Sequence, residues 1–146
     1  MSSQRKFILN AEQRVYVDQP WGSEDWLWNT KYCGKKLNVK KGKSSDWQAH
    51  RVRDKVLYVE RGKIVLTYGW DEDPKNSAQL MMTADMAFHI PSGMFHKFEG
   101  LEESLLLEFG THHNEKDILT AEEEEKPTRR SELKYEEEQS SDEDSE

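Results

Sequence analysis

Residues 42–62 of this chain read GKSSDWQAHRVRDKVLYVERG, and residues 91–96 read PSGMFH. In the first stretch Gln48 and His50 stand two residues apart, and side chains two apart on a strand point to the same face. In the second stretch His96 comes just after a Pro-Ser-Gly turn. Two such imidazoles on facing strands of a closed barrel can converge on one divalent cation. The two stretches therefore predict a β-barrel with a polar site inside it.

The segments around these stretches also favour strands over helices. They are short, rich in β-formers and separated by turn residues, at the spacing of roughly eight to twelve residues that is typical of a sandwich or barrel. The expected strands cover residues 15–17, 26–28, 37–39, 56–59, 64–68, 79–82, 87–90 and 105–109. Only residues 115–125 have a helical pattern. The predicted fold is all-β with one short C-terminal helical segment.

Length and charge indicate one folded domain and a tail. A chain of 146 residues with 34% hydrophobic residues is sized for a single core. Residues 122–146 hold twelve acidic and four basic side chains, which accounts for the whole formal charge of −8 and leaves residues 1–121 neutral. The same segment has too few apolar side chains to offset the entropy of ordering it. We expect a domain over residues 1–121 and a disordered acidic tail over residues 122–146.

The composition also bears on partners and location. A neutral domain with an acidic tail lacks the positive charge that drives nucleic-acid binding, so we expect no nucleic-acid partner. No apolar run approaches the roughly 18 residues of a membrane span, and the start of the chain is too polar for a secretion signal. We expect no membrane association and a cytoplasmic location. The single cysteine, Cys33, excludes an internal disulfide and fits a reducing compartment.

The order of the motifs resembles that of a known superfamily. The first motif has the layout G-x5-[His/Gln]-x-H, followed by an acidic position and G. The second, about thirty residues later, has the layout P-x-G-x-x-H. In this order the pair resembles the two motifs of the cupins. Within that superfamily the chain is similar to type II mannose-6-phosphate isomerases, which also occur fused to mannose-1-phosphate guanylyltransferases. The matching residues are Pro20, Trp21, Gly22, Lys36, Val39, Gly42, Ser45, Gln48, His50, Arg53, Gly62, Pro91, Gly93 and His96, with residues 107–113 and 117–119. The resemblance spans about residues 18–125 and implies a single cupin double-stranded β-barrel, or jelly roll.

The resemblance also implies a metal centre, which this sequence alters. In the family a divalent metal such as Zn, Mn or Fe would be held by Gln48, His50 and His96, and it would polarise the carbonyl of a sugar phosphate. The carboxylate ligand of the family falls at Lys55, whose ammonium has no lone pair to offer a metal. Asp54, one residue earlier, is the alternative acid. We therefore expect the metal to be weakly held or absent.

The remaining candidate site residues follow from the chemistry of isomerisation. Lys55, Asp54 and His89 are the candidate catalytic groups, because a base must move a proton between two carbons of the sugar. Arg51 and Arg53 are the candidate substrate-binding groups, because a guanidinium forms paired hydrogen bonds to phosphate oxygens.

Three functions therefore remain open at this point. One is sugar-phosphate isomerisation or epimerisation that feeds polysaccharide or nucleotide-sugar synthesis. The second is a non-catalytic cupin that binds a sugar or small ligand and has a degenerate metal site. The third is an interaction protein that acts through its tail and needs no pocket. By the same resemblance, we expect a homodimer.

Overall fold

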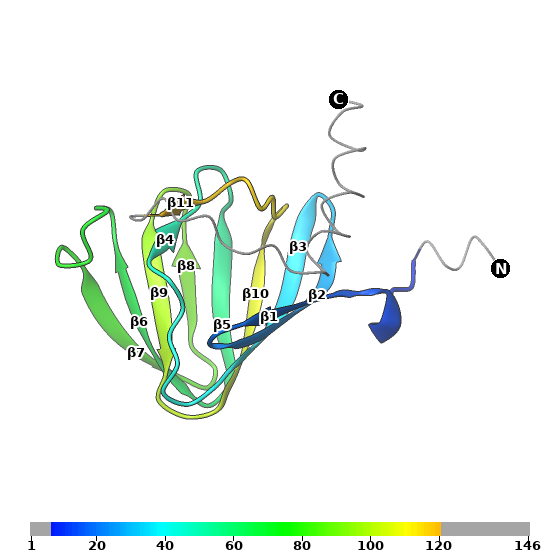
Figure 1. Ribbon diagram of the computed structural model, residues 1–146, viewed down its shortest axis with the longest axis horizontal. Helices are drawn as coiled ribbons and strands as arrows, with labels where there is room; N and C mark the ends of the chain where they lie inside the picture. Colours follow the sequence, from blue (N-terminus) through cyan, green and yellow to red (C-terminus); the bar gives the residue numbers. More distant parts are fainter. Residues whose placement is uncertain (1–6, 121–146) are drawn as a thin grey trace.

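The computed structural model describes residues 7–120, which form two antiparallel sheets that face each other as a jelly-roll barrel (Figure 1). The first sheet has the strand order β1-β2-β3-β10-β5-β8, and the second has the order β11-β4-β9-β6-β7. The strands are β1 (Val15–Gln19), β2 (Gly22–Asn29), β3 (Tyr32–Val39), β4 (Gln48–Ala49), β5 (Lys55–Arg61), β6 (Lys63–Gly69), β7 (Ala78–Thr83), β8 (Ala87–Ile90), β9 (Phe95–Gly100), β10 (Ser104–Thr111) and β11 (Leu119–Thr120). A short 3-10 helix, η1 (Ala11–Gln13), precedes β1. Within the described range, no helix has the length and apolar character to cross a membrane.

The predicted all-β barrel is confirmed, and each expected strand lies inside an observed one. Strands β4, β9 and β11 lie outside the listed segments, and β4 and β9 carry the Gln48 and His96 that were expected on facing strands. The segment 115–125 differs from its expected helix, because residues 115–116 form a turn and residues 119–120 form β11. The rest of that segment, and the predicted tail 122–146, lie outside the described residues.

The alternation of side chains along three neighbouring strands produces both the core and the site. Along β3, β5 and β10 every second side chain faces the barrel interior, as the two-residue period of a strand requires. Toward one end of the barrel these inward residues are apolar: Leu37, Val39, Leu57, Val59 and Leu106. Toward the other end they are charged: Lys35, Lys55 and Glu108. The barrel thus has an apolar floor beneath a charged upper part.

The floor closes by packing between the two sheets. Leu106 and Val59 of the first sheet belong to one buried cluster with Ile64 and Leu66 of β6. Trp21, in the turn between β1 and β2, contacts the Phe98 ring of β9 edge to face at a centroid distance of 4.9 Å. This packing fixes the sheets against each other below the charged residues.

Gly110 allows a long side chain to enter the barrel beside it. Gly110 of β10 is paired with Lys55 of β5. A Cβ atom at position 110 would lie 2.6 Å from the backbone oxygen of Asp54 and 2.7 Å from the Cβ of Lys55. Any residue larger than glycine would therefore collide with the strand that carries Lys55.

Candidate functional site

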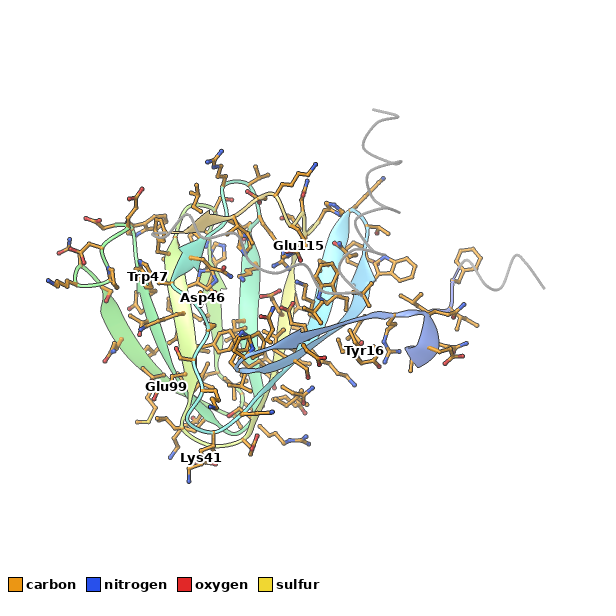
Figure 2. The ribbon with its side chains drawn as sticks, in the orientation of Figure 1. Tyr16, Lys41, Asp46, Trp47, Glu99 and Glu115 are labelled. Atoms are coloured by element: carbon orange, nitrogen blue, oxygen red, sulfur yellow. The ribbon has the colours of Figure 1, made fainter. Side chains whose placement is uncertain are left out.

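A cavity of about 70 Å³ lies in the charged part of the barrel. Its lining comes from β1, β2, β3, β5 and β10 of the first sheet, from β4 and β9 of the second, and from segments that connect the strands. Asp46, just before β4, is exposed and also contributes to the lining, and Figure 2 shows it beside Trp47. The volume is enough for a few water molecules or a small ligand.

Glu108 is the centre of a buried ion cluster in this cavity. Its Oε1 accepts a hydrogen bond from Lys55 Nζ at 2.9 Å, and its Oε2 lies 2.9 Å from Arg53 Nη1 and 3.9 Å from Lys35 Nζ. Burial alone would raise the pKa of Glu108, but Arg53, Lys55 and Lys35 together hold that pKa well below its usual value. Burial lowers the pKa of Lys55, and the charge of Glu108 opposes this shift. Glu108 is therefore a carboxylate whose two oxygens are both engaged by cations.

Lys35 connects this cluster to a second group of polar side chains. Its Nζ donates to Glu24 Oε1 at 3.1 Å and to His113 Nδ1 at 3.2 Å, and it lies 4.0 Å from the centroid of the Trp26 ring. Since Nδ1 of His113 accepts, its proton is on Nε2, which donates to Glu115 Oε1 at 3.2 Å. The Lys35 ammonium is thus surrounded by partners within the protein.

His50 and His96 present lone pairs to the interior. Nδ1 of His50 donates to the backbone oxygen of Asp117 at 2.7 Å, and Nδ1 of His96 donates to that of Met94 at 3.1 Å, so Nε2 of each ring carries the lone pair. The two ring centroids are 6.1 Å apart. Burial, reinforced by the positive charge of Lys55, lowers the pKa of His50 to about 2 and that of His96 well below 6.5. Both imidazoles are neutral at pH 7.

Asp117 holds in place the loop of residues 50–54 between β4 and β5, which we call the entrance loop. Its Oδ1 accepts from the backbone N–H of Arg51 at 2.8 Å and of Val52 at 3.1 Å, and its Oδ2 accepts from that of Arg53 at 3.0 Å. Its backbone oxygen accepts the proton of His50, as described above. One residue therefore orders the loop and sets the tautomer of a cavity histidine.

Five of the residues predicted from the sequence line the cavity, and three do not. Those in the lining are Gln48, His50, Arg53, Lys55 and His96. Asp54 Oδ1 instead lies 2.7 Å from His89 Nε2 on the outer surface, with side chains that are 49% and 59% exposed. Arg51 is exposed and also lies outside the lining. Two candidate catalytic bases, Asp54 and His89, therefore lie outside the cavity. The same is true of Arg51, one of the two candidate phosphate-binding residues.

Four further cavity residues, Glu24, Lys35, Glu108 and His113, are absent from the predicted site. Three of them had a signal in the strand pattern. Lys35 stands two residues before the buried Leu37, and Glu108 stands two residues after the buried Leu106. A charged residue in the inward phase of an otherwise apolar strand must find a partner inside the barrel. Glu24 likewise stands two residues before the buried Trp26, whereas His113 lies beyond the end of β10 and had no such signal.

The donor set can be compared with the divalent metal that the cupin resemblance implies. Gln48 Oε1 is buried without a hydrogen-bond partner in the described chain, and His50 and His96 add two Nε2 lone pairs. The position predicted for the carboxylate ligand, however, holds the Lys55 ammonium, and Glu108 is already paired with cations. Residues 7–120 contain no group of three or more His, Cys, Asp or Glu side chains that could hold a metal ion. The site as it stands does not fit a divalent cation.

Comparison with known proteins shows which fold this chain shares with solved structures. No family model matches this chain, and no curated protein is significantly similar to it. Among solved structures, the capsular polysaccharide assembling protein CapF from Staphylococcus aureus superposes with a TM-score of 0.66 at 16% identity, over 75% of this chain and 32% of that one. KdgF from Halomonas sp. gives 0.61 at 15% identity, over 75% and 97% of the two chains. An RmlC-like cupin from Shewanella frigidimarina gives 0.60 at 21% identity, over 73% and 91%. This chain spans about a third of the length of CapF, and the likeness in each case is to the cupin fold.

Proposed function

We propose that this cupin-fold protein binds a sugar or another small hydroxylated ligand inside its barrel, without a metal and without isomerising it. The observation that supports this is the Lys55 ammonium, which is buried in the cavity with its Nζ 2.9 Å from Glu108 Oε1. Removing one partner from a buried ion pair costs about 3–5 kcal/mol, so an incoming metal cannot readily displace Lys55. A fixed ammonium supplies a positive charge, but it has no open coordination position for a substrate.

The polar atoms around Lys55 suit a hydroxylated ligand. Gln48 Oε1 and the Nε2 atoms of His50 and His96 are acceptors, and a hydroxyl group can donate to each of them. A role connected with sugars is also in keeping with the fold neighbours, since CapF is described as a capsular polysaccharide assembling protein. The function we propose is therefore that of a binding module in carbohydrate metabolism.

Isomerisation or epimerisation of a sugar phosphate is the second candidate, and one observation favours it. Neutral imidazoles with lone pairs at Nε2, His50 and His96, share the cavity with the Lys55 cation. A base and a positive charge in one cavity inside the barrel are the elements that proton transfer through an enediolate requires. It ranks second because Arg53, the candidate phosphate ligand that lines the cavity, is already paired with Glu108. A Zn, Mn or Fe ion, if held at Gln48 and the two histidines, would be held weakly.

Calorimetry and a coupled enzyme assay distinguish the two candidates. We expect mannose, mannose-6-phosphate or fructose-6-phosphate to bind equally well in EDTA and in added zinc, manganese or iron, with no interconversion of the two sugar phosphates. Robust turnover that is lost in His50→Ala would establish the isomerase instead. Binding that EDTA abolishes would refute the metal-free site.

A further inference from the structure

We infer that the cavity takes a small hydroxy acid, with its carboxylate beside Lys55 and Arg53 and its hydroxyl on the acceptors of Gln48, His50 and His96. This inference rests on the proposed metal-free binding and names the chemical class of the ligand. It follows from the charge inside the barrel, from the hydrogen-bonding atoms that remain, and from the size of the cavity.

The charged groups inside the cavity do not cancel. Apart from the exposed Asp46 at its edge, three cations and two carboxylates line it, which leaves a charge of +1. These groups are Lys35, Arg53, Lys55, Glu24 and Glu108. The excess lies at Arg53 and Lys55, which share the single carboxylate of Glu108, and an excess charge in a barrel interior is unfavourable. A ligand with one negative charge completes the set.

The unused donors show where the negative group would lie. Nη2 of Arg53 is buried and has no hydrogen-bond partner in the part of the chain that the structure describes. Lys55 Nζ donates to Glu108 and can make two more hydrogen bonds. Lys35, in contrast, is already bound to Glu24 and His113. The carboxylate therefore belongs beside Lys55 and Arg53.

The unused acceptors require a second group on the same ligand. Gln48 Oε1 and the Nε2 lone pairs of His50 and His96 cannot accept from a carboxylate, which has no proton to donate. A simple carboxylic acid would leave these acceptors facing its own negative oxygens. A hydroxyl group on the adjoining carbon donates to one of them and removes the conflict.

The size of the cavity limits the ligand to a few non-hydrogen atoms. A volume of about 70 Å³ can hold a two- or three-carbon hydroxy acid such as glycolate, lactate or glycerate. Because the cavity reaches the surface near the exposed Asp46, the acid end of a longer sugar acid could enter in the same way.

Three matched compounds test the inference by calorimetry, in EDTA and at constant ionic strength. Lactate has both groups, propionate lacks the hydroxyl, and propane-1,2-diol lacks the charge. We expect lactate to bind at least about tenfold more tightly than propane-1,2-diol, since a charge-assisted hydrogen bond is commonly worth that factor or more, and about fivefold more tightly than propionate, since a neutral hydrogen bond is worth about 1 kcal/mol. Equal affinities for lactate and propionate would overturn the role of the hydroxyl.

Variants assign the two halves of the ligand to their partners. Lys55→Met should remove the preference for lactate over propane-1,2-diol, and Gln48→Leu should reduce the affinity for lactate toward that for propionate. Arg51→Met is the matched control, because it removes a neighbouring cation that lies outside the cavity, and lactate binding should not change. Unchanged lactate binding in Lys55→Met would overturn the anion site.

A measurement on the unmodified protein covers the case in which Lys55→Met does not fold. Lactate should shift the ring ¹⁵N resonances of His50 or His96, and an absence of any shift at saturating lactate would overturn the inference. Binding of a sugar such as mannose without any binding of lactate would refute the hydroxy-acid assignment and leave the proposed function intact. Binding of neither would remove both.

Discussion

Lowering the pH from 7 to 5 should destabilise this protein, because burial disfavours the protonated form of three histidines in the folded state. Burial, together with nearby cations, lowers the pKa of His50, His96 and His113 below the ordinary value of 6.5. Below pH 6.5 each histidine takes up a proton in the unfolded chain but not in the native one. The stability that comes from these groups is therefore complete above pH 6.5 and is lost as the pH falls.

The size of the effect follows from the number of protons. Each proton taken up only by the unfolded state changes the free energy of unfolding by about 1.4 kcal/mol per pH unit. Three histidines thus give a slope of at most about 4 kcal/mol per pH unit below pH 6.5, and at most about 6 kcal/mol is lost by pH 5. This loss is comparable with the whole free energy of unfolding of a small domain, which is commonly about 5–15 kcal/mol. The lowered pKa of Glu108 extends the loss to pH values below 4.5.

Urea unfolding followed by tryptophan fluorescence at several pH values between 5.5 and 7.5 measures this slope. Replacing His96 with Gln should reduce the slope by one proton even if the variant is less stable at pH 7. His89→Gln is the matched control, because that imidazole lies on the outer surface at 59% exposure, and the slope should not change. A slope below one proton in the unmodified protein would refute the neutral buried histidines.

Four further outcomes are expected. Lys55→Glu should raise the affinity for zinc by about tenfold or more, since it restores a carboxylate ligand and removes a positive charge. Asp54→Ala should leave the zinc affinity unchanged. If calorimetry shows instead that Asp54→Ala abolishes zinc binding and Lys55→Glu has no effect, Asp54 is the ligand. Gly110→Ala should lower the free energy of unfolding by about 1–3 kcal/mol, because its Cβ would lie 2.6 Å from a backbone oxygen; no change in urea unfolding would show that β5 can move. Deletion of residues 126–146 should leave the melting temperature nearly unchanged, and a drop of many degrees would show that the segment docks on the barrel. Analytical ultracentrifugation should show a homodimer, and a monomer at all concentrations would exclude it.

The fold could be predicted because its determinants are local. Short alternating segments at barrel spacing, together with the two histidine motifs, were sufficient to place His50 and His96 inside a cupin barrel. The inward position of Lys55 could also be predicted, because Leu57 and Val59 stand in the same phase of β5. The same alternation assigns Asp54 to the other side, so the proposal of Asp54 as an alternative ligand conflicted with a pattern already visible in the sequence.

The rest of the site depends on tertiary contacts that a single sequence does not show. The helical pattern after residue 115 is overridden because Asp117 bonds to the entrance loop and His50, and β11 pairs with β4. His113 reaches Lys35 from a segment 78 residues later in the chain. Such contacts follow from the register of the barrel, which periodicity alone does not determine.

Asp117 has a consequence for how the cavity opens. Its carboxylate holds three backbone amides of the entrance loop, and its backbone oxygen holds the Nδ1 proton of His50. Opening of the loop that displaces residue 117 would free the His50 proton at the same time. Closure of the loop is therefore thermodynamically linked to the His50 tautomer that has its proton on Nδ1 and its lone pair on Nε2. A ligand that donates a hydrogen bond to Nε2 must then also favour the closed loop. The amide protons of residues 51–53 should then exchange more slowly with solvent when the cavity is filled, although none of them touches the ligand.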